Sequence, residues 1–361
     1  MLTAIIFIIV IGVLVLVHEF GHFVFAKRAG MKVEEFGFGF PPRMIGFKKG
    51  ETVYSINWIP FGGFVKILGE DGDTRAPRSF ASGTFWQRFL VIVAGVIMNF
   101  LLAVLLLTIV NSFGLRVGLI DGQTGAARNL EVQVVSVSDG SPAAKGGLQS
   151  LDNIKGYKKA DGSIAPIQTT TDVQNAVSSH LGQPLTLEIG RGGSTVEETV
   201  IPRANPPEGQ GALGISLALT GEISYPWYEA IWRGISDATF LAMATIQGYY
   251  ALLKTLFVHG RLIADVSGPI GIATLTGQAA RVGINYLLQF VAMISVNLAV
   301  LNIIPFPALD GGRAVILIIE KLKGSPVHKN IEGWINMVGF YLLVALMLYI
   351  TYKDIAKFFV K

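Results

Sequence analysis

The chain contains no cysteine, and this absence limits the kinds of metal site open to it. Disulfide bonds and thiolate ligands are excluded, so any zinc site must use His, Asp or Glu. Charge is also scarce, because only 15% of the 361 residues are Asp, Glu, Lys or Arg, against about 25% in soluble proteins. Since 51% of the residues are hydrophobic, the composition indicates a membrane protein.

The sequence also lacks a long basic run and any basic patch interleaved with aromatic residues, and its formal net charge is only +4. A protein that binds nucleic acid usually shows one of these features. Nucleic acid is therefore not an expected partner, whereas the lipid bilayer is.

Long apolar segments predict a polytopic α-helical membrane protein with about four transmembrane helices, since crossing the bilayer takes about 20 apolar residues. The first segment has no basic n-region and is too long for the apolar part of a signal peptide, so we expect a retained helix. Residues 226–257 are helical in pattern but carry charges. They fit an amphipathic helix on the membrane surface better than a fifth span, and both interpretations stay open. The four predicted spans are Leu2–Ala26, Phe89–Phe113, Tyr286–Leu309 and Gly333–Tyr352.

Two regions between the spans have strand patterns. In 52-TVYSINWIPFGGFVKIL-68, apolar and polar residues alternate, which predicts a small membrane-associated β-sheet. An interfacial loop with two hairpins is the alternative. Residues 128–203 combine strand patterns with two helices and predict a compact α+β domain. The predicted division is 1–26, helix 1; 27–88, β-region; 89–113, helix 2; 128–203, α+β domain; 204–285, amphipathic helical region; 286–312, helix 3; and 333–352, helix 4.

The stretch 15-VLVHEFGHFVF-25 carries a His-Glu-x-x-His pattern inside the first predicted span. On a helix, His18 and His22 face the same side and can reach one zinc ion. Glu19 is placed to act as general base toward a zinc-bound water. Three ionisable residues within one turn of a membrane span are costly, which favours a functional site over a hydrogen-bonded pair of interfacial histidines.

Two ligands are too few for a catalytic zinc, which usually has three from the protein. The best candidate for the third is Asp310, which ends the third predicted span in 302-NIIPFPALDGGR-313. The two prolines of this segment break the helix, and non-helical backbone is tolerated in a membrane only where it is buried in protein or lines a wet cavity. The alternative is an ordinary Asp-Gly-Gly turn at a membrane exit, which leaves the prolines unexplained.

The pair HEFGH at 18–22 and NIIPFPALDGG at 302–312 resembles the site-2 protease family of intramembrane zinc metalloproteases, and within it the bacterial RseP-like members. The segments 60-PFGGFVKILGED-71 and 79-SFASGTFWQRFLVIVAGVIMNF-100 resemble that family's β-loop and second span. The block 140-GSPAAKGGLQSLDNI-154 resembles a circularly permuted PDZ domain. RseP itself carries two tandem PDZ domains, whereas this chain has room for one.

The resemblance implies that His18, His22 and Asp310 bind zinc, that Glu19 is the general base and acid, and that Asn302 helps to hold the substrate. It further implies cleavage within transmembrane segments of single-pass proteins, such as anti-sigma factors or remnant signal peptides. We expect the β-region to add the substrate as a strand, with Gly62 and Gly63 keeping the approach open, and the PDZ domain to filter substrates. Plain helix packing or lining of the site can each explain 95-GVIMN-99.

The distribution of basic residues favours one orientation in the membrane. The loops after the first and third spans are rich in Lys and Arg and would be cytoplasmic by the positive-inside rule. The active site then faces the cytoplasmic side of a bacterial inner membrane, and the PDZ domain lies outside the cytoplasm. Lys353, Lys357 and Lys361 run against this orientation.

Two other classes of function compete with a peptidase. A catalytically idle membrane-embedded PDZ adaptor is the main alternative, and an intact His-Glu-x-x-His pattern with a matching Asp argues against it. A metal transporter would place polar residues along several spans, but here they gather at one depth. The patterns of serine or aspartyl intramembrane proteases are absent from the sequence.

Overall fold

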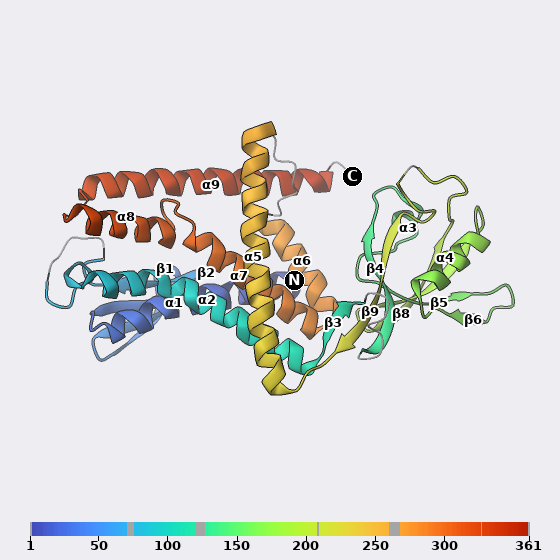
Figure 1. The fold of residues 1–361 in the computed structure, drawn as a ribbon, viewed down its shortest axis with the longest axis horizontal. Helices are drawn as coiled ribbons and strands as arrows, with labels where there is room; N and C mark the ends of the chain where they lie inside the picture. Colours follow the sequence, from blue (N-terminus) through green and yellow to red (C-terminus); the bar gives the residue numbers. More distant parts are fainter. Residues whose placement is uncertain are drawn as a thin grey trace. The chain divides into compact units, whose positions relative to one another are not determined.

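The computed structural model describes residues 2–70, 76–119, 127–207, 209–259, 268–325 and 327–359. The chain divides into two compact units (Figure 1). One consists of Met1–Thr108, Ile231–Ala280 and Leu287–Lys361, and the other of Ile109–Ala230 and Arg281–Tyr286. Asp71, which ends one of the segments resembling site-2 proteases, lies outside the described residues.

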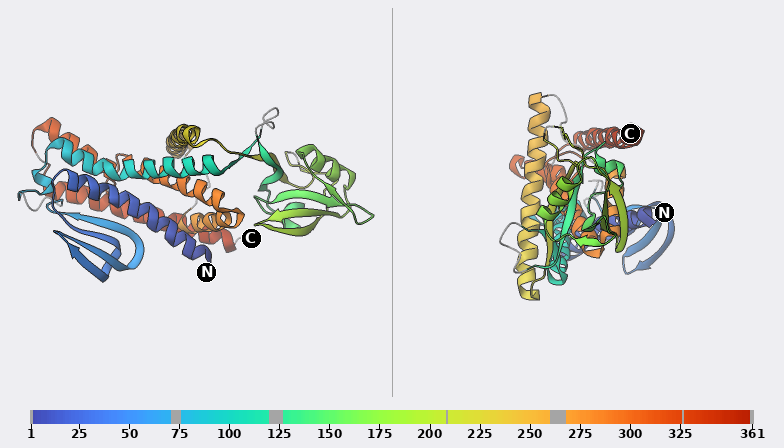
Figure 2. Two further views of the ribbon diagram at one scale, coloured as in Figure 1. Left: turned by 90° about the horizontal axis from the view of Figure 1, so that it is seen from below. Right: turned by 90° about the vertical axis from the view of Figure 1, so that its right-hand side faces the viewer.

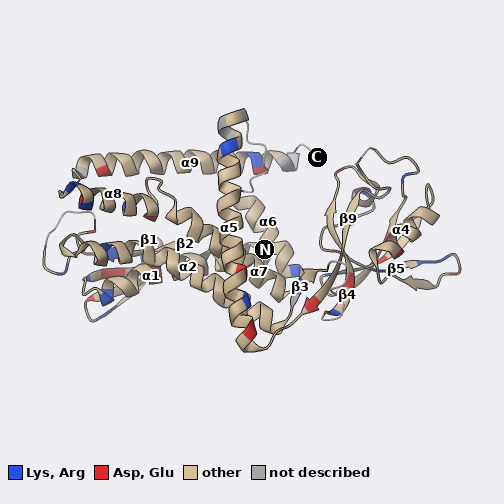
Figure 3. Cartoon of the chain, in the orientation of Figure 1, with Lys and Arg blue, Asp and Glu red and all other residues tan. Residues whose placement is uncertain are grey.

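Four helices in the described part of the chain are long and apolar enough to cross a membrane, as predicted. They are α1 (Leu2–Arg28), α2 (Phe85–Phe113), α7 (Ile284–Ile303) and most of α9 (Lys329–Phe359). Residues 333–352 of α9 contain no charged side chain, and charge in this helix lies toward its two ends (Figure 3). Helix α5 (Trp227–His259) is not among the four candidates.

The helices of the first unit pack through apolar and small side chains. Residues of α2, α5 and α7 share one buried cluster that includes Ala103, Ala238 and Val296. A second cluster joins α1 and α7, where Leu14 is fully buried, and Ile272 of α6 (Pro269–Val282) packs against it. These contacts bury the sides of α1, α2 and α7 that face one another, while the other sides expose large apolar residues as lipid contact requires.

The predicted β-sheet between the first two spans is present and is made of two long strands. Strands β1 (Val33–Lys49) and β2 (Thr52–Ile67) pair with several register shifts. Phe36 pairs with Tyr54 on one side and with Val65 on the other, so the first part of β1 is central. Residues 63–67 of β2 form an outer strand segment. The sheet lies along α1 in both views (Figures 1 and 2).

The second unit has an α+β fold with one β-sheet, whose strands differ in length. Its strands are β3 (Leu115–Gly118), β4 (Arg128–Val137), β5 (Asn153–Lys158), β6 (Ile164–Pro166), β7 (Leu185–Arg191), β8 (Ser194–Val200) and β9 (Ile215–Ile223). The order is β3-β9-β4-β5-β7-β8, with β6 paired to β5. The helices α3 (Pro142–Lys145) and α4 (Thr170–Ser179) accompany it, and Val132, Leu187 and Ile189 are fully buried in its core.

The predicted boundary between the α+β domain (128–203) and the helical region (204–285) is wrong. The range 204–285, expected to be helical, contains strand β9, which pairs with β3 and β4. The apolar residues of β9 alternate along the chain, as expected for a strand with one buried face. Ile215, Leu217 and Leu219 pack on the core of the sheet. The compact unit is accordingly larger than the predicted 128–203.

The third predicted span ends earlier than expected. Helix α7 stops at Ile303, residues 304–309 are not helical, and α8 (Asp310–Lys323) follows. Asp310 therefore opens a new helix and does not end the membrane span. The reason is the pair Pro305 and Pro307, which cannot continue the hydrogen bonding of α7.

Candidate metal centre

Helix α1 presents His18 and His22 on one face, one turn apart, with His18 only 9% exposed. The Nδ1 atom of His22 lies 2.7 Å from the main-chain oxygen of Val91 on α2. A carbonyl accepts a hydrogen bond only from Nδ1–H, so this contact fixes the tautomer and leaves Nε2 of His22 as the ligand atom. The two Nε2 atoms of His18 and His22 are 3.2 Å apart.

Asp310 brings a carboxylate to the same place from the start of α8. Its Oδ2 lies 3.1 Å from Nε2 of His18 and 3.5 Å from Nε2 of His22. Four ligand atoms placed tetrahedrally at 2.0–2.1 Å from zinc are about 3.3 Å from one another. The three observed distances scatter around that value, so these atoms fit three corners of a zinc site.

The Oδ2 atom of Asp310 supports the same conclusion. It is buried, and its neighbours among the described residues include Nε2 of His18 and of His22, which donate no hydrogen bond when the proton of each ring is on Nδ1. A buried acceptor without a donor is costly and rare, and a bound cation is one of its ordinary explanations. Among the described residues, His18, His22 and Asp310 are also the one group of three or more His, Asp or Glu side chains that lie close enough together to hold a metal ion. The donor set, two imidazoles and a carboxylate, is one that catalytic zinc sites use.

Glu19 lies beside this centre without belonging to the three ligands. The backbone of β2 approaches it closely, since a Cβ added at Gly63 would lie 3.4 Å from Cγ of Glu19. Glu19 is thus placed between the metal ligands and the outer strand segment of the sheet.

The other predicted site residues lie at different distances from this centre. Gly62 has a left-handed backbone (φ +97°) and packs against the ring of Phe40 rather than against Glu19. Asn302 lies in the last turn of α7 and is half-buried. Among the described residues it has no hydrogen bond to the three ligands. The structure therefore brings together His18, His22, Asp310, Glu19 and Gly63, whereas Gly62 packs on Phe40.

The segment 95-GVIMN-99 lines the centre. A Cβ at Gly95 would lie 2.6 Å from both His18 and His22, so only glycine leaves room for the two rings. Asn99 is fully buried, with its Nδ2 3.5 Å from Nδ1 of His18 and its Oδ1 without a hydrogen-bond partner among the described residues. With the amide turned over, Oδ1 would accept the Nδ1–H of His18. Its side chain would then orient His18 as Val91 orients His22.

Asp310 depends on the loop before it, which several close contacts hold. Ala308 has a left-handed backbone (φ +71°), and its N–H donates to Oδ1 of Asn336 on α9 over 3.2 Å. A Cβ on Gly311 or Gly312 would lie 2.3 Å from a carbonyl oxygen of the segment 303–306. The Asp-Gly-Gly sequence therefore lets the start of α8 pack directly on the loop backbone. The contact between His22 and the backbone of Val91 cannot be predicted from the sequence, because every residue carries a carbonyl group. Gly95 and Asn99 can be recognised in the sequence as a small residue and an amide one helical turn apart.

A comparison with known families adds to this geometry. The family profile described as Peptidase family M50 matches residues 6–346, which is nearly the whole chain. The chain belongs to Peptidase family M50. The match confirms the site-2 protease family predicted from HEFGH and NIIPFPALDGG.

Similar proteins cover the chain almost completely. A protein of Clostridium perfringens is 39% identical over 342 residues, which are 95% of each chain. Zinc metalloprotease RasP of Geobacillus kaustophilus is 30% identical and covers 98% of this chain and 97% of its own. Regulator of sigma-W protease RasP of Bacillus subtilis is 29% identical and covers 99% of both. The prediction of a metallopeptidase is confirmed, and the predicted zinc agrees with the names of these relatives.

Proposed function

We propose that this M50 peptidase is a zinc endopeptidase that hydrolyses peptide bonds within transmembrane segments of single-pass membrane proteins. The observation that carries the proposal is the position of the metal centre, where two ligands lie on α1, a helix suited to span a membrane. A substrate that reaches this centre must come from the bilayer or from its surface. Zinc bound there would polarise the scissile carbonyl and make water a better nucleophile.

The residues of the chain perform the remaining steps. Glu19 takes a proton from the attacking water and passes it to the leaving amine, as a general base and then a general acid. His18, His22 and Asp310 hold the metal, while the carbonyl of Val91 and the side chain of Asn99 orient the two imidazoles. The lack of a side chain at Gly63 lets the backbone of β2 approach Glu19 closely, so a peptide added at this strand would lie beside the general base.

We further propose that substrate adds to the sheet as a strand. Residues 63–67 of β2 pair with β1 on one side only in the described part of the chain. Their second edge can accept hydrogen bonds from an extended peptide. This matters because a transmembrane helix must unwind before its carbonyls become available, and strand addition replaces the lost hydrogen bonds.

The membrane arrangement and the substrate class belong to the same proposal. The active site faces the cytoplasmic side of a bacterial plasma membrane, and the α+β unit is a PDZ domain outside the cytoplasm that filters substrates. The name of the Bacillus subtilis relative connects that protein with sigma-W regulation. We therefore propose anti-sigma factors or remnant signal peptides as substrates, with Asn302 and Gly62 assisting substrate binding.

The decisive experiment combines metal analysis with a cleavage assay on the full chain in detergent. Glu19→Gln should keep its zinc and lose about 10²–10⁴-fold in cleavage of a single-pass substrate. Glu51→Gln is the matched control, because Glu51 is bound to Lys27 and Arg78 and is not part of the centre. Full activity of Glu19→Gln would contradict the mechanism, and loss of its zinc would show that Glu19 is a ligand.

The filter needs a separate test with the unaltered protein. Two substrates with the same transmembrane segment are compared, one with a short outer segment and one with a folded outer domain. The filter predicts cleavage of the first and protection of the second. Equal rates for the two substrates would contradict it.

A further inference from the structure

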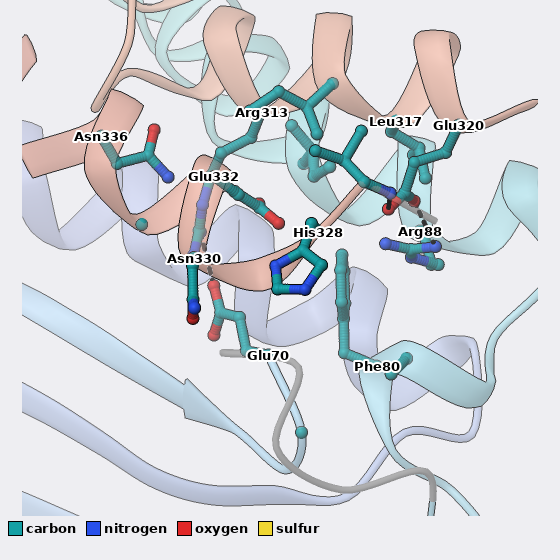
Figure 4. A pocket seen from close by; sticks show the side chains of 16 residues that line it. Glu70, Phe80, Arg88, Arg313, Leu317, Glu320, His328, Asn330, Glu332 and Asn336 are labelled. Atoms are coloured by element: carbon teal, nitrogen blue, oxygen red, sulfur yellow. Dashed lines mark hydrogen bonds and ion pairs between the residues drawn. The ribbon is translucent and has the colours of Figure 1, made fainter. Parts of the chain in front are cut away.

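An ion pair joins the helix of the third ligand to the sheet. Nη1 of Arg313 donates to Oε1 of Glu70 over 2.6 Å. The two side chains lie on the wall of a pocket of about 630 Å³ between α8, α9 and the end of β2 (Figure 4). Arg313 follows Asp310 by three residues on α8, so the two share one side of the helix. A force applied at Arg313 therefore acts on the turn that carries Asp310.

The other partner, Glu70, lies in the turn that closes β2. The N–H of Leu68 donates to the oxygen of Lys32 over 2.9 Å, and the N–H of Phe80 donates to the oxygen of Leu68 over 2.7 Å. These bonds hold the turn against the start of β1 and against the short helix η1 (Phe80–Ser82). The same strand β2 passes Glu19 at Gly63. The ion pair therefore links the turn after β2, the strand that faces Glu19, to the helix that carries Asp310.

We propose that Glu70 and Arg313 are positioning residues whose ion pair fixes the first turn of α8 where Asp310 completes the metal centre. The inference rests on the proposed function, since it takes Asp310 to be a zinc ligand. His18 and His22 need no such device, because a continuous helix sets their spacing. Asp310 begins a separate helix after the non-helical loop 304–309. Its position relative to α1 must therefore be set by contacts that α8 makes with other elements.

The two effects of this pair on the protein differ in size. The side chains of Arg313 and Glu70 are 38% and 23% exposed, and ion pairs with this exposure contribute little to the free energy of unfolding. By contrast, loss of an outer contact that orients a metal ligand typically lowers metal affinity or activity about 10–100-fold. The pair should therefore matter for zinc affinity much more than for thermal stability.

A second ion pair on the same helix provides a matched control. Nη1 of Arg88 donates to Oε2 of Glu320 over 3.1 Å, and both residues also line the pocket (Figure 4). This pair likewise joins α8 to another element, here α2. Glu320 lies near the end of α8, well away from Asp310. A general role in packing α8 would apply to both pairs, whereas a positioning role applies only to the first.

The test measures zinc affinity by competition with a chromogenic chelator, on the full chain in detergent. Arg313→Gln should weaken zinc binding about 10-fold, and Glu70→Gln should weaken it similarly. The rate constant kcat should fall with KM nearly unchanged, because the substrate edge of β2 is not altered. Arg313→Lys should restore most of the affinity, since the lysine ammonium keeps the positive charge and can donate to Glu70. Arg88→Gln should leave zinc affinity at the wild-type value.

The sign of the change separates positioning from plain electrostatics. Removing the positive charge of Arg313 would by itself tighten binding of a cation, and removing the negative charge of Glu70 would weaken it. Positioning predicts that both variants weaken it. Tighter or unchanged binding in Arg313→Gln would overturn the inference, and so would an equal loss in Arg88→Gln.

Asp310→Ala distinguishes this inference from the proposed function. If Asp310→Ala loses zinc while Arg313→Gln and Glu70→Gln keep full affinity, only the role of the ion pair is wrong. If Asp310→Ala itself keeps zinc, the metal centre is wrongly assigned, and the inference falls with it.

Discussion

The two halves of the metal centre are built in different ways. His18 and His22 lie on the unbroken helix α1, and their relative position follows from helical geometry. Asp310 comes from a start of helix preceded by two prolines, a left-handed Ala308 and an unhelical loop. One half is set by local backbone structure, and the other depends on close packing of the start of α8 on its loop and on the contact of that loop with α9.

This difference has a physical reason. A helix of the bilayer satisfies its own backbone groups, so adding side chains on one face costs little organisation. The loop 304–309 cannot do so and relies on partners such as Asn336. In return, the broken segment lets a carboxylate approach the histidines from a separate direction, which a tetrahedral site requires.

The largest expected effect comes from removing one of the two histidines on α1. His18→Ala removes one of three ligands and should abolish stoichiometric zinc binding, measured by elemental analysis after dialysis. The thermal midpoint of the metal-free protein should stay close to that of metal-free wild type, because α1 remains continuous. His180→Ala is the control, since His180 ends α4 in the other unit and is not one of the proposed ligands. Retained zinc in His18→Ala would mean that the centre uses other ligands.

Breaking the second half should damage both zinc binding and stability. In Gly312→Ala the new Cβ would lie 2.3 Å from the oxygen of Phe306, so the start of α8 must shift. Overpacking of this kind costs about 1–3 kcal/mol of unfolding free energy, and Asp310 moves with the helix. Gly333→Ala, with no atom within 4 Å of its new Cβ, should be neutral or slightly stabilising. Equal thermal midpoints and zinc contents for the two variants would refute this account.

A smaller effect is expected from narrowing the space around the histidines. The Cβ of Gly95→Ala would lie 2.6 Å from atoms of both His18 and His22. The rings can yield more easily than backbone, so we expect weaker zinc binding with a smaller loss of stability than in Gly312→Ala. Gly248→Ala on α5 is the control, because its Cβ would meet nothing within 4 Å. Unchanged zinc affinity in Gly95→Ala would show that the glycine serves helix packing alone.

The smallest effect concerns a single hydrogen bond behind the loop. Asn336→Ala removes the acceptor for the N–H of Ala308 and should cost about 1 kcal/mol of unfolding free energy. A modest loss of zinc affinity should accompany it, because Ala308 lies two residues before Asp310. Asn336→Asp, which keeps an acceptor oxygen, should recover both quantities. A midpoint equal to wild type in Asn336→Ala would remove this contact from the supports of Asp310.

The sequence predicted the position of the two histidines on α1 more completely than the position of Asp310 at the start of α8. The apolar runs placed the four candidate spans, and the spacing of His18 and His22 placed both predicted ligands on one helical face. Asp310 was identified as the third candidate, and the prolines correctly indicated a broken helix. Its place at the start of α8 was missed, because sequence shows where a helix stops more clearly than where the next begins.

Other features could not be predicted because they depend on long-range packing. The carbonyl of Val91 carries no side-chain signal, and the ion pair of Glu70 with Arg313 joins residues that are distant in the chain. The apolar residues of β9 alternate, which is typical of a strand, but the strand is short next to the long helical segment that follows it. The double pairing of β1 depends on register shifts, which the alternation of residues alone does not specify.

The buried Oδ2 of Asp310 also bears on how the protein matures in the cell. An unsatisfied buried acceptor costs about 1–3 kcal/mol, and a cation that binds only the folded state adds stability in proportion to the logarithm of its concentration over Kd. Zinc supply and fold stability are therefore thermodynamically linked in this chain. We expect chelation to lower the thermal midpoint and to speed proteolysis of α8 and the loop before it. Metal starvation would then reduce the amount of the protease as well as the activity of each molecule.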